Sequence, residues 1–160
     1  MSSIVIAEKP SQARDIITAV GTQSGTVLAA QGHLLALEEP DAVKDEWKKW
    51  TDDLLLPPDG RYKLVPDNSS GKGPRLRDIQ AALRTAKVVY AATDCDREGQ
   101  LIAQAILEYF NYRGTVKRVM FTAQDPVSLQ TAFARAEDNS KYQNLYNAAM
   151  ARSQADQIYN

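Results

Sequence analysis

The sequence predicts an α/β fold: an open, mostly parallel sheet covered by helices on both faces. Two observations carry this prediction. Short apolar runs rich in β-branched residues alternate with segments of helical spacing, a pattern typical of parallel sheets with crossover helices. The chain also has 160 residues, of which 44% are hydrophobic and 24% charged, which suits one globular domain with a core of its own.

The first half of the chain begins with the clearest strand. The apolar run Ser3-Ile4-Val5-Ile6-Ala7 predicts a buried strand. Glu8-Lys9-Pro10-Ser11 interrupts the pattern, and apolar spacing over 12–20 then predicts a helix with Ser11 as its N-cap. Further extended segments are expected at 26–30 and 33–37, on either side of a turn at Gln31-Gly32.

Residues 38–74 follow neither the strand nor the helix period. We interpret them as a long irregular excursion within one domain that covers 1–160, because regular patterns resume afterwards. Such excursions in compact domains are often functional. The elements expected after it are a helix at 75–85, a strand at 88–92, a helix at 99–110, a strand at 116–122, a helix at 126–137 and a helix at 142–158.

Composition excludes some classes of protein and leaves others open. No apolar run approaches the ~20 residues that span a bilayer, and the first residues are too polar for a secretory signal peptide. The single cysteine, Cys95, cannot form an internal disulfide, so a reducing cytoplasm is expected. The net charge of −1 lacks the basic excess of a free-standing DNA-binding domain. Local basic patches, or a larger protein around this chain, could still provide contacts with nucleic acid.

Acidic residues follow two of the predicted strands. Glu8 follows the first, and Asp94, Asp96 and Glu98 follow the strand at 88–92. If these strands are neighbours, four carboxylates converge on one edge of the sheet, where ligands bind in such folds. Clustered carboxylates raise one another's pKa and suit Mg²⁺. A cation there, with Lys9 beside it, could stabilise charge on a phosphate during phosphoryl transfer.

Simpler interpretations stand beside several of these residues. A lone Asp-x-Asp is usually a turn or a helix cap, and Glu98 suits the first turn of a helix as well as it suits a metal. Arg97 is expected to hold the acids in place through a local salt bridge, and His33 to be a satisfied turn residue rather than a catalytic one. Tryptophans on the excursion, Trp47 and Trp50, suit packing or stacking on a base.

Three motifs, taken together, resemble the Toprim domain of type IA DNA topoisomerases, with bacterial topoisomerase III the most similar. They are Glu8-Lys9-Pro10-Ser11, Gly32-His33-Leu34-Leu35 and the run from Ala92 to Ile102 that contains Asp94-Cys95-Asp96-Arg97-Glu98-Gly99. The resemblance extends over essentially the whole chain, as far as Ala151-Arg152-Ser153-Gln154-Ala155-Asp156.

This resemblance implies a Rossmann-like Toprim fold and an enzyme that cuts one DNA strand through a 5′-phosphotyrosine, passes another strand and reseals the break. Its implied cofactor is Mg²⁺, for which Mn²⁺ can substitute. Its implied partners are single-stranded DNA, or DNA with single-stranded regions, and further domains of the same polypeptide in the bacterial cytoplasm. The implied roles are metal binding by Glu8, Asp94, Asp96 and Glu98, phosphate contact and catalysis by Lys9 with these acids, and DNA contact by Trp50, Arg152 and Gln157.

The chain also departs from the family pattern. Gln157 stands where the family usually has tryptophan, so a DNA contact there is in doubt, and Cys95 stands where proline or alanine is commoner. None of the seven tyrosines lies in the Tyr-x-Arg-Thr context of the family's nucleophile. We therefore expect an excised domain whose last helix, at about 140–160, leads into the next domain. Alone, it should not relax DNA.

Two alternative functions stay open at this point. One is a Toprim nuclease or primase-like protein, whose acids would act on water or nucleotides. The other is a non-catalytic nucleic-acid-binding module, whose acids merely cap helices.

Overall fold

The computed structural model describes residues 2–49, 51, 54–69 and 71–159 and confirms the α/β architecture. Its main sheet has the strand order β2-β1-β5-β6-β7. All neighbouring pairs are parallel except β6 and β7. The strands are β1 (Ser3–Ala7), β2 (Thr26–Ala29), β5 (Val88–Ala92), β6 (Thr115–Arg118) and β7 (Glu137–Asp138).

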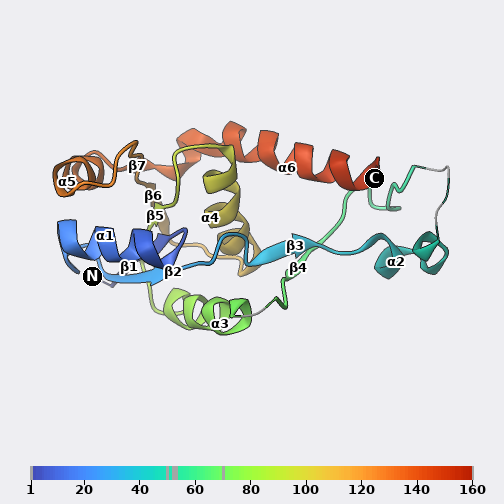
Figure 1. Ribbon diagram of the computed structural model, residues 1–160, viewed down its shortest axis with the longest axis horizontal. Coiled ribbons are helices and arrows are strands. Elements are labelled where there is room, and N and C mark those ends of the chain that lie inside the picture. The colour runs from blue at the N-terminus through green and yellow to red at the C-terminus, as the bar shows by residue number, and fades with distance from the viewer. Residues whose placement is uncertain (1, 50, 52–53, 70, 160) are drawn as a thin grey trace.

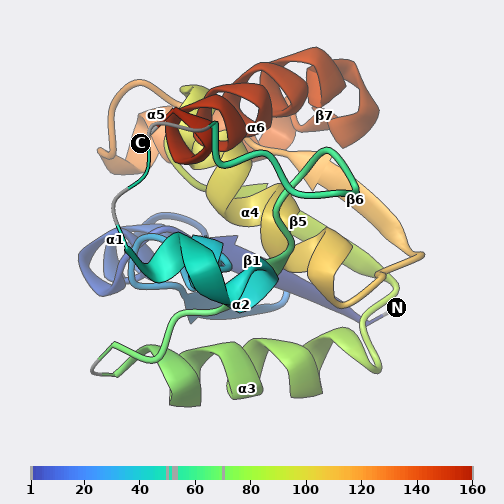
Figure 2. The same ribbon diagram turned by 90° about the vertical axis from the view of Figure 1, so that its right-hand side faces the viewer.

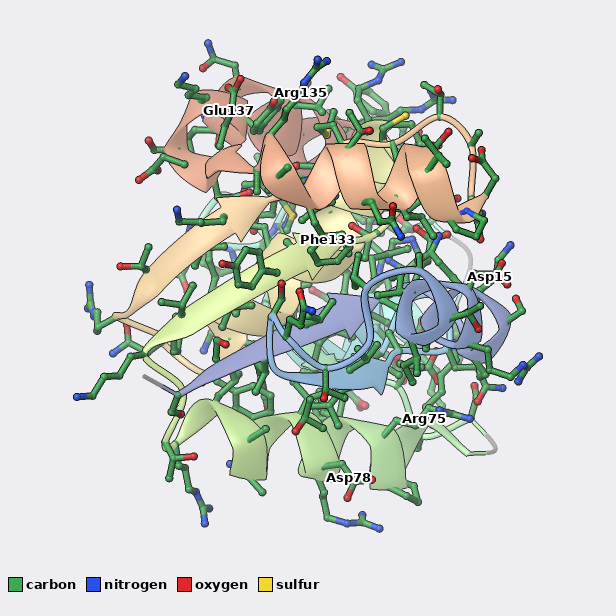
Figure 3. All side chains as sticks on the ribbon, turned by 90° about the vertical axis from the view of Figure 1, so that its left-hand side faces the viewer. Asp15, Arg75, Asp78, Phe133, Arg135 and Glu137 are labelled. Atoms are coloured by element: carbon green, nitrogen blue, oxygen red, sulfur yellow. The ribbon has the colours of Figure 1, made fainter. Side chains whose placement is uncertain are left out.

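Helices cover both faces of this sheet (Figure 1). Successive residues of a strand point to opposite faces, so Ile4 and Ile6 join one core while Val5 and Ala7 join the other. The first core includes residues of α3 (Lys72–Leu83), α4 (Arg97–Tyr109) and α6 (Gln143–Ile158), and the second includes residues of α1 (Pro10–Val20) and α5 (Pro126–Ala134). Figure 3 shows Phe133 of α5 between its helix and the sheet, where its ring meets Tyr90 at 5.9 Å between centroids.

The stretch 38–74 is less irregular than the sequence predicts. Its elements are α2 (Pro40–Val43), the 3₁₀ helix η1 (Asp45–Lys48), β4 (Leu64–Pro66) and the first residues of α3. β4 pairs antiparallel with β3 (Leu35–Leu37) in a separate two-stranded sheet. This sheet and α2 extend from the body of the molecule in Figure 1, and α2 faces the viewer in Figure 2. The elements are short, which is why their periodicity is weak in the sequence.

Several predicted boundaries are wrong by a few residues. α1 begins at Pro10, so Lys9 occupies the N-cap position and Ser11 is not the cap. Pro at the first helical position needs no N–H donor, which explains the earlier start. α3 begins at Lys72 and α4 at Arg97, β6 ends at Arg118, and α5 ends at Ala134, after which Glu137 belongs to β7. The 3₁₀ helix η2 (Asn139–Tyr142) then leads into α6. No described helix is long and apolar enough to cross a membrane.

Candidate functional site

Glu8 and Asp94 lie side by side because the strands that precede them are neighbours. β1 pairs in parallel with β5, and Ala7 is in register with Ala92. The carboxyl ends of both strands therefore meet at one edge of the sheet, which meets the condition set for the acids to converge there. The backbone N–H of Asp94 donates a hydrogen bond to Glu8 Oε1 at 3.1 Å.

One buried amide ties the two acids together. Gln12, on the first turn of α1, has no exposed surface. Its Oε1 accepts a hydrogen bond from the Glu8 backbone N–H at 2.8 Å, and its Nε2 donates to Asp94 Oδ1 at 2.9 Å. Because an amide offers both a donor and an acceptor, Gln12 sets the position of both strand ends.

The pKa of the Glu8 carboxyl is raised above its ordinary value. Burial is the largest cause, and the negative charges of Asp94 and Asp96 add to it, whereas the hydrogen bond from the Asp94 backbone acts in the opposite direction. An oxygen acceptor that is half-buried beside two further carboxylates gains most from a nearby cation or from a proton.

Asp96 and Glu98 lie at the start of α4 and have separate hydrogen-bond partners. Asp96 is the N-cap of α4, where its Oδ1 accepts from the Gly99 N–H at 2.7 Å. The Glu98 Oε2 lies 2.8 Å from His33 Nε2, and both side chains are partly exposed. The prediction that His33 is a satisfied residue agrees with this contact, which also joins the segment after β2 to α4.

The cation that holds the acidic turn is Arg118, not Arg97. Arg97 is exposed at the start of α4, and none of the ion pairs within the described residues involves it. Arg118 lies at the end of β6 and is only 1% exposed. Its guanidinium donates to the backbone carbonyls of Thr93 at 2.9 Å and of Asp94. The predicted salt-bridge role of Arg97 is therefore wrong.

The turn between β5 and α4 is also compact. A Cβ on Gly99 would lie 2.0 Å from the Asp94 carbonyl oxygen, a separation that no side chain allows. The Thr93 hydroxyl donates to the Gly99 carbonyl at 2.6 Å inside the protein. The glycine of the Asp-x-Asp-Arg-Glu-Gly motif thus lets the backbone close on itself and brings the acids to the edge of the sheet.

The remaining predicted residues are spread over the surface. Lys9 is exposed at the N-cap position of α1, next to Glu8, and Arg152 is exposed on α6. Gln157 donates through Nε2 to the Glu38 carbonyl at 2.9 Å, so its amide joins α6 to the segment after β3. Trp47 is partly buried with the Lys44 ammonium 5.5 Å from its ring centre. Trp50 lies outside the described residues, and its DNA contact stays a prediction.

The acids fit a divalent cation by their chemistry and their charge. Carboxylate oxygens are the ligands that Mg²⁺ prefers, and Glu8 is destabilised in its charged form by burial and by its acidic neighbours. Among the described residues, however, no three histidine, cysteine, aspartate or glutamate side chains are grouped closely enough to hold a metal. Asp96 caps its helix and Glu98 contacts His33, so the predicted four-carboxylate convergence is limited to the Glu8–Asp94 pair with Asp96 nearby.

Three residues that shape the site escaped the sequence prediction, namely Gln12, Gln100 and Arg118. All three are buried polar residues, but only Gln100 lies within a largely apolar buried run, on α4. That mismatch was the available signal, because a polar side chain is seldom buried without a set of hydrogen-bond partners. The partners themselves lie on other elements, so the sequence does not identify them.

Comparisons with known proteins agree with this geometry. Residues 3–124 match the Toprim domain family. The chain is 32% identical over 169 aligned positions to DNA topoisomerase 3 of Staphylococcus haemolyticus, covering 99% of this chain and 24% of that protein. It is 34% identical to DNA topoisomerase 3 of Bacillus anthracis, with 96% and 22% covered.

A solved structure has the same fold. Full-length topoisomerase I from Thermotoga maritima superposes with a TM-score of 0.71 at 22% identity, over 97% of this chain and 24% of that one. The chain thus spans about a quarter of the length of the relatives it matches. With a family match over residues 3–124 and the acidic edge that β1 and β5 form, the chain belongs to the Toprim domain family.

Proposed function

We propose that this chain is the Toprim part of a type IA DNA topoisomerase similar to topoisomerase 3, and that it holds the acidic, cation-binding half of the strand-cleavage site. One observation carries the proposal: Glu8 and Asp94 meet at adjacent strand ends, 3.1 Å apart from carboxylate oxygen to backbone nitrogen, and share Gln12. The similarity to proteins named DNA topoisomerase 3 supports the same function.

In this proposal the Glu8–Asp94 pair would hold Mg²⁺ or Mn²⁺, and Asp96 would move into contact with the bound cation, with Glu98 in support. The cation, when bound, offsets negative charge on the phosphate that is transferred. Asp94 is already oriented by Gln12. Asp96 has one carboxylate oxygen in the helix cap, which leaves its second oxygen as the proposed ligand.

Glu8 and Lys9 would act on the scissile phosphate. Burial raises the pKa of Glu8, and a carboxylate with a raised pKa is a stronger base, better suited to exchange a proton with a departing or attacking oxygen. Lys9 is exposed beside it at the start of α1. Its ammonium and the N-terminus of α1 favour a negatively charged group at the same place.

The nucleophilic tyrosine, the strand passage and most of the DNA contacts would come from other parts of a longer polypeptide. The substrate we propose is single-stranded DNA or DNA with single-stranded regions, in the bacterial cytoplasm. Arg152, Gln157 and Trp50 would add DNA contacts from this chain.

The test is titration of this chain with MnCl₂ and MgCl₂ by calorimetry. Asp94→Asn combined with Asp96→Asn should weaken binding by roughly 10-fold or more, since it removes two of the proposed ligands. The matched control is Asp125→Asn with Asp138→Asn, which removes the same charge from two acids that cap other helices. Equal loss in both double variants, or none in either, would contradict the metal site.

A second experiment addresses the whole protein. In a longer polypeptide that relaxes supercoiled DNA, Glu8→Gln should reduce the rate of relaxation by roughly 100-fold, in the range by which a positioned acid or base accelerates proton transfer. Asp125→Asn serves as the control. Relaxation at the unchanged rate in Glu8→Gln would remove Glu8 from the reaction.

A further inference from the structure

Arg118 carries a positive charge that has no carboxylate partner within the described parts of the chain. Its five side-chain hydrogen bonds go to neutral acceptors: the carbonyls of Ala91, Thr93, Asp94 and Val119, and the Gln100 Oε1. Buried charges are usually paired, because an isolated charge inside a protein is costly. An unpaired buried guanidinium therefore calls for an explanation.

The acidic turn contributes negative charges that act on Arg118. Arg118 donates hydrogen bonds to the carbonyls of Thr93 and Asp94, so its guanidinium contacts the backbone of the turn that carries the proposed metal ligands. Burial lowers the pKa of Arg118 to about 10, and the negative charges of Asp96 and Glu8 are among the groups that oppose this shift. Arg118 thus stays protonated at neutral pH and interacts with the acids of the site.

Gln100 occupies the place where a carboxylate would neutralise Arg118. This residue has no exposed surface, and its Oε1 accepts from the Arg118 Nε at 2.7 Å. Its amide nitrogen donates to Asn139 Oδ1 at 2.8 Å and to Gln104 Oε1 at 3.0 Å. A glutamate has the same size and the same acceptor, so the neutral amide is what leaves the charge of Arg118 uncompensated.

We propose that Arg118 acts as a fixed positive charge beneath the acidic turn and that Gln100, by staying neutral, sets the affinity of this turn for divalent cations. Gln100 is then a positioning residue: it touches neither cation nor DNA and acts through Arg118. The inference rests on the proposed function, because it assumes that the acids bind a cation.

The consequence is a site that binds its cation weakly until further negative charge arrives. A positive charge near the ligands opposes a divalent cation, and the interior screens this repulsion less than water does. A DNA phosphate at the same edge would add the missing negative charge. The cation would then be held best when the substrate is present.

Gln100→Glu tests the proposal. It adds a negative charge next to Arg118 and so offsets the positive charge that opposes the cation. The Kd for Mn²⁺ should fall by roughly three- to tenfold, the size of effect expected from one nearby unit charge. The matched control is Gln104→Glu, the same substitution one turn further along α4 at a residue whose recorded bonds do not include Arg118. We expect it to change the Kd by about twofold at most.

Calorimetry with MnCl₂ measures the affinity, and luminescence of TbCl₃ serves if Mn²⁺ binds too weakly. Circular dichroism and urea unfolding show which variants are folded. If Gln100→Glu does not fold, Arg118→Gln removes the positive charge but keeps amide donors for the carbonyls, and it should also tighten binding.

The outcomes separate this inference from the proposed function. Tighter binding in Gln100→Glu, but not in Gln104→Glu, would support it. If the wild-type chain binds Mn²⁺ but a folded Gln100→Glu or Arg118→Gln variant binds it equally or more weakly, the inference is overturned and the metal site stands. A wild-type chain that binds neither ion would overturn the metal site itself, and this inference with it.

Discussion

The turn after β1 and the turn after β5 both place acids at the same edge of the sheet, yet different parts of the chain hold them. The β1 turn depends mainly on neighbours in sequence: Gln12 accepts from the Glu8 N–H, four residues earlier. The β5 turn depends on Arg118, which comes from β6, 24 residues beyond Asp94. Its backbone is also tighter, since Gly99 packs against the Asp94 carbonyl.

The difference shows that one edge of a sheet can be held both by hydrogen bonds between neighbours in sequence and by hydrogen bonds from a distant strand. The turn after β1 is local and can be predicted from the sequence as a strand, an acid and the first residues of a helix. The turn after β5 is non-local, because β6 must be in place before Arg118 can donate to the turn's carbonyls. We therefore expect the β5 turn to be more sensitive to substitution than the β1 turn.

The largest expected effect is that of Gly99→Ala. The added Cβ would lie 2.0 Å from the Asp94 carbonyl oxygen, so the turn must shift, at a cost of about 3 kcal/mol. Gly32→Ala, in the segment after β2 whose backbone N–H donates to the Glu8 carbonyl, meets no atom within 4 Å and has a φ of +63°, so it should cost only about 1 kcal/mol. Urea unfolding measures both, and equal losses would contradict the close packing that sets the β5 turn apart.

Gln12→Leu should have the next largest effect. It leaves the Glu8 N–H without its acceptor and Asp94 without a donor, at a cost of about 2 kcal/mol. Mn²⁺ affinity should fall at the same time by roughly tenfold, because a residue that orients a ligand is lost. The control is Gln130→Leu, an exposed residue on α5 with one bond to the Ala19 carbonyl. If Gln12→Leu kept full Mn²⁺ affinity, Gln12 would not orient the acids.

Asp96→Ala separates the capping role of this residue from its charge. Loss of the cap should cost about 1 kcal/mol, and Asp125→Ala should cost the same, because Asp125 caps α5 through the Ser128 N–H. Only Asp96→Ala should weaken Mn²⁺ binding. Thermal unfolding and calorimetry of the pair measure the two effects, and equal affinities in both variants would make Asp96 only a cap.

The smallest effect is expected outside both turns, at Asp67. Hydrogen bonds from Ser69, followed by Lys72, lower the pKa of this carboxyl to about 2. A carboxyl with a lowered pKa in the folded state stabilises the protein above its unfolded pKa, and this stabilisation is lost as the pH falls through the folded pKa. The Tm difference between wild type and Asp67→Asn should thus shrink from pH 5 towards about pH 2. A difference that persists at pH 2 would contradict this assignment.

Much of the site was predictable because it depends on strand order and local motifs. Glu8 and Asp94 each follow a strand of apolar, β-branched residues, and the structure pairs β1 with β5, the condition on which the predicted convergence of their acids depends. The ends of the short elements after the second strand were harder to predict. β3, β4 and α2 have only three or four residues each, too few to establish a period.

The sequence by itself determined the α/β class, the strands that end in acids and the family resemblance, since these depend on periodicity and on contiguous residues. Only the tertiary structure decided which side chains hold the acids. Arg118 rather than Arg97 supports the turn, and Gln12 joins Asp94 across 82 positions of sequence. A charged or amide side chain has no preference for one partner until folding brings a carbonyl or carboxylate within hydrogen-bonding distance in a buried place, and the strand order of the sheet determines which groups those are.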